Sequence, residues 1–99
     1  MKAPTVKIDG KTYAALSPRV SAWRKLIKIK SSDIELDSEE GLDMMIDFFV
    51  DVFNNKSVNS EAIEENVAIE DFFMFFQECG FWIEHKLHEK MSQVPEKNE

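Results

Sequence analysis

The chain has 99 residues, of which 43% are hydrophobic and 31% are charged. This length and balance are typical of one small folded domain and exclude a wholly disordered chain. Cys79 is the only cysteine, which excludes a disulfide within one copy and suits a reducing compartment. No apolar run approaches the ~18 residues that a membrane-spanning helix needs, and we expect neither a membrane segment nor an export signal.

The charge of the chain is unevenly distributed along the sequence. The net charge is −7, but residues 1–30 hold eight basic and one acidic side chain, whereas residues 31–99 hold four basic and eighteen acidic ones. One interpretation is that the basic segment lies across the acidic helices of its own copy or of a neighbouring copy, in weak and screened ion pairs. The other is that a surface with two signs of charge orients partners during assembly.

The first predicted element is a β-hairpin centred on Asp9-Gly10. Two strand-like segments, residues 5–8 and 11–16, flank this dipeptide. Asp-Gly is a strong hairpin signal because both turn positions must tolerate a positive φ. A lone hairpin is marginal in water, so it must pack on a helix or pair with the edge of another copy.

The first helix is predicted from Ser17-Pro18 to about Lys30. A capping side chain followed by proline is typical of a helix start. The helix carries one apolar stripe with Leu26 beside it. The members of this stripe are Val20, Trp23 and Ile27.

The second helix is predicted from about Ser38 to Asn54, after a capping box formed by Asp37 and Glu40. Nearly all of its surface is apolar apart from one narrow stripe of Asp and Asn side chains. Two apolar faces on one helix imply two packing partners. The first face holds Leu42, Met45, Ile46, Phe49 and Phe53, and the second holds Met44, Phe48 and Val52.

A short helix over residues 61–65 is predicted next, started by Ser60 and ended by Asn66 in the left-handed conformation. The last helix is predicted from about Ala68 to Lys90, and it either continues through Gly80 or breaks there. Its predicted core stripe is Ile69, Phe72, Phe73, Phe76, Ile83 and Leu87, and a second stripe is Phe75, Cys79 and Trp82, flanked by Met74 and Phe81.

The predicted fold is therefore mainly α: a small N-terminal β-hairpin followed by three main helices and one short helix. We expect a single helical domain over residues 1–91 and a flexible tail over residues 92–99. Two of the helices carry more apolar surface than so short a chain can cover, because small domains bury only roughly 60–65% of the surface that the unfolded chain exposes. We therefore expect self-association, with the chain as a homo-oligomer.

Motifs for catalysis or cofactor binding are missing from the sequence. His85 and His88 lie three residues apart, but no third metal ligand is spaced to join them, and we expect a solvated helix end. The carboxylates lie at helix caps or on polar stripes, and no serine or glycine-rich loop has the context of a nucleophile or a phosphate site. We expect no enzyme activity, no cofactor and no metal.

The basic first helix raises a second hypothesis, a small regulatory or nucleic-acid-binding protein. Four basic side chains near one tryptophan would supply the phosphate contacts. The acidic chain as a whole and the lack of a groove-reading motif weigh against nucleic acid. The side chains in question are Arg24, Lys25, Lys28 and Lys30.

The middle of the sequence, residues 48–56 followed by residues 60–67, resembles the tail assembly chaperones of long-tailed bacteriophages, particularly those of Gram-positive hosts. The opening residues 6–13 and the basic helix after them are similar to the start of that family. The resemblance covers residues 5–90. The chain departs from the family pattern at Asn66, where a glycine is expected.

The resemblance implies a protein that binds the tape measure protein and keeps its apolar helices soluble during tail morphogenesis. The tail tube protein is a further expected partner, and the site of action is the bacterial host cytoplasm, with no place in the finished virion. A structural head–tail component is the alternative within this class. The predicted partner-binding residues, which could instead be core, are Phe48, Val52, Phe75, Phe81 and Trp82.

Overall fold

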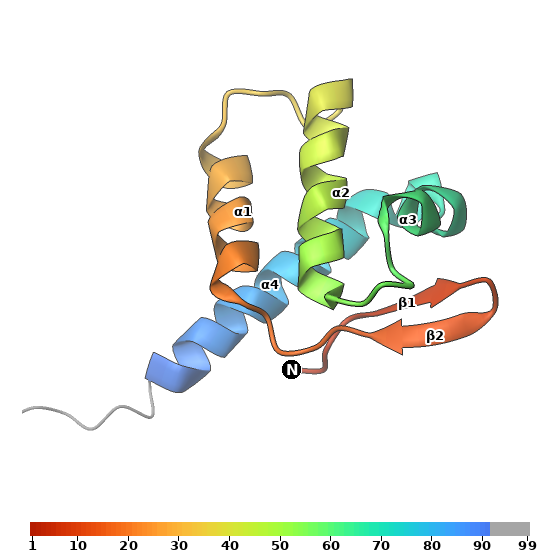
Figure 1. Ribbon diagram of the computed structural model, residues 1–99. Helices are drawn as coiled ribbons and strands as arrows, with labels where there is room; N and C mark the ends of the chain where they lie inside the picture. Colours follow the sequence, from red (N-terminus) through yellow and green to blue (C-terminus); the bar gives the residue numbers. More distant parts are fainter. Residues whose placement is uncertain (92–99) are drawn as a thin grey trace, which may run out of the picture.

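A computed structural model describes residues 1–91 of the chain (Figure 1). It confirms the predicted fold class, a small hairpin followed by three main helices and one short helix. The predicted tail over residues 92–99 lies outside the described residues. The elements are β1 (Thr5–Ile8), β2 (Lys11–Ala14), α1 (Val20–Ser31), α2 (Glu39–Phe53), α3 (Ser60–Asn66), the 3-10 turn η1 (Ile69–Asp71) and α4 (Phe72–Met91).

Helices α1 and α2 lie side by side and antiparallel, and α4 crosses behind both of them (Figure 1). The hairpin and α3 lie together at the other side of α2. In this arrangement α2 is the central helix, because α1, α3 and α4 all pack against it.

The hairpin forms around the predicted Asp9-Gly10 turn. Asp9 has a φ of 50° and Gly10 a φ of 85°, as the turn requires. Val6 and Ile8 are buried, and the backbone N–H of Asp9 donates to the side-chain oxygen of Asn66 at 2.9 Å. The hairpin therefore packs on α3 of its own copy.

Helix α1 begins at Val20, three residues after the predicted start at Ser17. The N–H of Ala15 donates to the carbonyl of Pro4 at 2.9 Å, which keeps the chain extended after β2. Arg19 is also extended, with φ −93° and ψ 165°, and no side chain caps the helix. The predicted cap by Ser17 was therefore wrong, because the link to the hairpin delays the first helical turn.

The caps of α2 and α3 are each shifted by one residue from their predicted positions. Ser38, and not Asp37, caps α2 by accepting from the N–H of Gly41 at 3.0 Å. Asn59, and not Ser60, caps α3. Serine, asparagine and aspartate are all good caps, so local composition does not decide between neighbours.

The left-handed residue predicted at Asn66 is found instead at Asn54, which ends α2 with a φ of 48°. Asn66 is helical, and its side chain donates to the carbonyl of Ala62 while accepting from Asp9. The amide of Asn66 thus has a structural role that glycine could not fill. It joins α3 to the turn of the hairpin.

The core is built around the phenylalanines of α2. Phe48, Phe49 and Phe53 are fully buried, and the ring of Phe49 lies 4.6 Å from that of Phe75, centroid to centroid. Phe49 also makes edge contacts with Phe72. The two packing partners predicted for α2 are therefore elements of the same chain.

Helix α4 runs through Gly80 without a break. Four residues of the predicted core stripe lie inward, because Ile83 is buried and Phe72, Phe76 and Leu87 pack against the core. The prediction was wrong for Ile69 and Phe73, which are exposed, while Cys79 and Trp82 of the second stripe are buried. Ile69 lies in the 3-10 turn η1, which has fewer residues per turn than an α-helix and shifts its register relative to α4.

Candidate partner-binding surfaces

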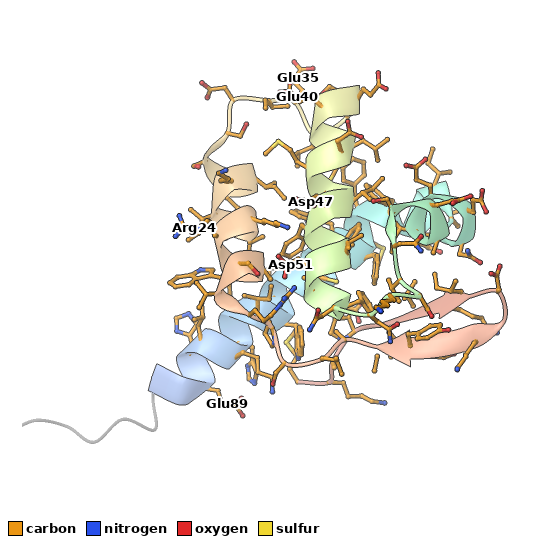
Figure 2. All side chains as sticks on the ribbon, viewed as in Figure 1. Arg24, Glu35, Glu40, Asp47, Asp51 and Glu89 are labelled. Atoms are coloured by element: carbon orange, nitrogen blue, oxygen red, sulfur yellow. The ribbon has the colours of Figure 1, made fainter. Side chains whose placement is uncertain are left out.

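A buried carboxylate fixes the orientation of α1 against α2. The side chain of Asp51 on α2 is only 4% exposed. One of its oxygens accepts from Arg19 at 2.9 Å and from Ser21 at 3.0 Å, and the other lies 3.1 Å from Nζ of Lys25. Figure 2 shows Asp51 on the side of α2 that faces α1, while Arg24 points away on the outer side of α1.

The electrostatics of this network favour the charged forms. Burial alone would raise the pKa of Asp51, but the hydrogen bonds from Ser21, Lys25 and Arg19 and the charge of Lys25 together hold it below its usual range. Burial likewise opposes the charge of Lys25, but its contacts with Asp51 and Asp47 raise the pKa of its ammonium group. The network holds α1 in one rotation about its axis.

The interpretation that the basic segment lies across acidic helices of the same copy is confirmed for part of that segment. Lys25 bridges Asp47 and Asp51 of α2, and Lys30 pairs with Glu84 of α4. The four basic residues suggested for nucleic acid are thereby separated. Lys25 and Lys30 form ion pairs within the fold, whereas Arg24 and Lys28 are exposed and have no ion pair among residues 1–91.

The rotation of α1 leaves its larger apolar stripe on the outside. Ala22, Leu26 and Ile29 are the residues that α1 buries. The opposite stripe is exposed, with Val20 71% exposed and with Arg24 and Lys28 beside it. We call this stripe and its two charges the α1 surface, which consists of Val20, Trp23, Ile27, Arg24 and Lys28.

A cleft of about 570 Å³ lies between the start of α1 and the last part of α4. Its apolar lining comes from both helices, with Val20 and Trp23 from α1 and Ile83 and Leu87 from α4. Arg19, Lys86 and Glu89 also line the cleft, so its apolar lining has charged side chains beside it. A groove of this kind between two helices can accept the apolar face of a third helix.

A second exposed apolar surface lies on η1 and α4, on the side turned away from α2. Met74 is 72% exposed and Phe81 is 58% exposed. Glu78 lies four residues after Met74 on α4, so it borders the same face, and Glu70 is an exposed residue of η1 next to Ile69. We call this region the α4 surface, which consists of Ile69, Phe73, Met74, Phe81, Glu70 and Glu78.

The five predicted partner-binding residues have different environments. Phe48 and Val52 are fully buried in one copy, and Trp82 is 2% exposed. Phe75 is half-buried against Phe49 and Phe53, and only Phe81 lies on an exposed surface. Their role in partner binding stays a prediction, and for the buried residues it requires the fold to open.

The exposed stripe of α1 was visible in the sequence but was not selected as a binding surface. The spacing of Val20, Trp23 and Ile27 gives the stripe and not the direction it faces. That direction depends on Asp51, which contacts Ser21 across 30 positions of sequence. Charge beside the stripe was the available signal, since Arg24 and Lys28 border its apolar residues.

Among residues 1–91, no group of three His, Cys, Asp or Glu side chains could hold a metal ion. Burial, together with the charge of Glu78, raises the pKa of Cys79 well above its usual range, so the thiol stays neutral. None of the described helices is both long and apolar enough to cross a membrane.

These features define a small helical protein with exposed apolar surface on two of the helices that flank α2. A comparison with protein families matches residues 1–99 to the family described as phage tail chaperone protein, and the chain belongs to this family. Its resemblance to the tail assembly chaperones is thereby confirmed, and the family points to a non-enzymatic role. No curated protein and no solved structure matches the chain.

Proposed function

We propose that this tail assembly chaperone binds apolar helices of the tape measure protein and keeps them soluble while the tail is built. The observation that carries the proposal is the apolar cleft between α1 and α4, where Val20 and Trp23 face Ile83 and Leu87. A long client rich in apolar helix would otherwise aggregate through the same faces. The apolar face of one such helix would bind in the cleft until the tail assembles.

The site of action that we propose is the cytoplasm of the bacterial host, before the tail is complete. The tail tube protein would then displace the chaperone as it assembles around the client. The net charge of −7 supports this role, because like-charged complexes repel one another and stay dispersed. Mass spectrometry of purified virions should find no copy of the chain.

The client proposal is tested by co-expressing the tape measure protein with the chaperone and measuring the soluble fraction of the client. The double variant Val20→Asp/Leu87→Glu places two charges in the cleft, and we expect it to lose most of the protection. Val20 is at the first position of α1, where an aspartate suits the helix dipole. Leu87 is partly buried against the core, so circular dichroism must show that the double variant keeps its helical content.

Leu42→Glu is the matched control, because Leu42 is an exposed apolar residue of α2 outside the cleft. This variant should protect the client as well as the wild type does. Full protection by a folded Val20→Asp/Leu87→Glu variant would contradict the proposal that the cleft is the client site.

Self-association belongs to the same proposal. The chain has two exposed apolar surfaces, and contiguous apolar patches commonly mark interfaces. The predicted homo-oligomer would cover them between encounters with a client.

A further inference from the structure

The α1 surface and the α4 surface carry charges of opposite sign. On α1, Arg24 lies four residues after Val20 and three before Ile27, so it borders both. On α4, Glu78 lies four residues after Met74 and three before Phe81. Each surface is thus an apolar helix face with a single sign of charge along it.

The bordering charges are not used within the fold. Lys25 and Lys30 of α1 pair with carboxylates of α2 and α4, but neither Arg24 nor Lys28 has an ion pair among the described residues. The same holds within residues 1–91 for Glu70 and Glu78, whose side chains are exposed. These four charges remain available to a partner.

The two apolar stripes also have similar lengths. At 1.5 Å per residue, Val20 to Ile27 extends for about 10 Å and Phe73 to Phe81 for about 12 Å along their helices. We infer that the α1 surface of one copy binds the α4 surface of a second copy, with Arg24 and Lys28 facing Glu70 and Glu78. The inference specifies the self-association part of the proposed function and does not depend on the client.

Charge decides between this pairing and a symmetric one. Pairing two α1 surfaces would place Arg24 and Lys28 of one copy beside the same basic residues of the other. Pairing two α4 surfaces would place carboxylates beside carboxylates. Both contacts are unfavourable because the charges are alike. Pairing two different surfaces either closes into a ring or leaves one surface of each kind unused at the ends of the assembly. In the open case, association continues beyond a dimer as the concentration rises.

The inferred contact also shares residues with the client cleft. Val20 and Trp23 belong to the α1 surface and line the cleft. A second copy on α1 therefore competes with a client helix for the same side chains, and an apolar helix with acidic borders is the client that would compete best.

The test uses two charge-reversed variants of the full chain, measured by sedimentation velocity over a wide range of concentrations. One variant is Arg24→Glu/Lys28→Glu, and the other is Glu70→Lys/Glu78→Lys. In each variant both surfaces carry the same sign, so we expect self-association to weaken at least about tenfold. Raising the salt concentration should weaken the wild-type assembly as well.

Mixing the two variants is the decisive measurement. The acidic α1 surface of the first variant can bind the basic α4 surface of the second, and the basic α1 surface of the second can bind the acidic α4 surface of the first. We expect the mixture to recover the association that each variant loses alone. A symmetric α1 or α4 interface would leave at least one variant self-associated.

Lys2→Glu/Lys7→Glu is the matched control for Arg24→Glu/Lys28→Glu, because it makes the same change in net charge at exposed residues of the N-terminal segment. This control should associate as the wild type does. A monomeric wild type, unchanged association of either variant, or a mixture that stays dissociated would each overturn the inference. A monomer that still protects the tape measure protein would leave the client proposal standing.

Discussion

Helices α1 and α2 lie side by side, yet the chain covers them very differently. Helix α2 has apolar residues on nearly every side, and α1, α3 and α4 bury almost all of them. Helix α1 buries only Ala22, Leu26 and Ile29, and its other apolar residues, Val20, Trp23 and Ile27, are exposed. The difference shows that a chain this small can bury the surface of its central helix but not that of every flanking helix. The flanking helices therefore keep apolar surface that a partner can bind.

The largest expected effect comes from removing a ring at the centre of α2. Phe49→Ala should lower the free energy of unfolding by about 3–5 kcal/mol, because the ring is fully buried and the cavity would lack other contacts. Urea denaturation followed by circular dichroism measures it. The matched variant Phe81→Ala removes an exposed ring of α4 and should lower the same quantity by less than about 1 kcal/mol. Equal losses of unfolding free energy in the two variants would contradict the difference in burial between Phe49 on α2 and Phe81 on α4.

A smaller loss is expected from the network that joins the two helices. Asp51→Asn removes the charge that Arg19 and Lys25 contact, and it should lower the free energy of unfolding by about 1–3 kcal/mol. Asp47→Asn is the control, since Asp47 is exposed and its pair with Lys25 should contribute less than about 1 kcal/mol. Equal shifts of the urea midpoint in Asp51→Asn and Asp47→Asn would contradict the importance of the network for stability.

The same network predicts a loss of stability in acid. The pKa of Asp51 is lowered on folding, so its contribution is complete above its ordinary value of 3.8 and is lost as the pH falls through the folded value. Lys25 behaves in the opposite sense, because its pKa is raised above 10.5 and its contribution is lost only as the pH rises beyond that value. Unfolding measured between neutral pH and acid should therefore show a steeper loss for the wild type than for Asp51→Asn.

A gain in stability is expected where α4 crosses the buried side of α1. A methyl group at Gly80 would lie 3.5 Å from a side-chain carbon of Leu26, an ordinary contact distance. Gly80→Ala should therefore raise the free energy of unfolding by about 0.5–1 kcal/mol through helix propensity. Gly41→Ala is the contrast, because its methyl group would lie 2.3 Å from the carbonyl oxygen of Glu35 and must destabilise the start of α2. A loss of thermal stability in Gly80→Ala would show that α1 and α4 lie too close together at Gly80 to accept a methyl group.

The smallest effect on stability is expected on the outer side of α1. Val20→Ser should change the free energy of unfolding by less than about 0.5 kcal/mol, because the side chain is mostly exposed. It should nevertheless weaken client protection or self-association, both of which use this residue. A large fall in melting temperature would place Val20 in the core and remove the contrast between α1 and α2.

Much of the fold could be predicted from local sequence. The Asp9-Gly10 turn and the helices are all present, because turn chemistry and helical periodicity depend on nearby residues. The errors lie at helix ends, where Ser38 and Asn59 cap in place of their neighbours. The late start of α1 was not predictable locally, since it depends on the contact between Ala15 and Pro4 across the hairpin.

The binding surfaces were harder to predict than the fold. A pattern such as Phe48 and Val52 shows that a helix has a second apolar face, but it does not show whether the same chain covers that face. In α2 the chain does so, whereas the stripe containing Val20 stays exposed because Asp51 holds the other side of α1 inward. Such outcomes depend on contacts between residues far apart in sequence.

The two tryptophans of the chain lie in opposite environments, which gives the protein two separate optical reporters. Trp82 is enclosed between helices, whereas Trp23 stands partly in solvent at the edge of the cleft. The emission wavelength of an indole depends on the polarity around it, so a Trp82→Phe variant would leave a signal that shifts to the blue when anything settles on α1. The complementary Trp23→Phe variant would report only on the packing of the interior. Comparing the two variants would distinguish binding at the outer face of α1 from unfolding.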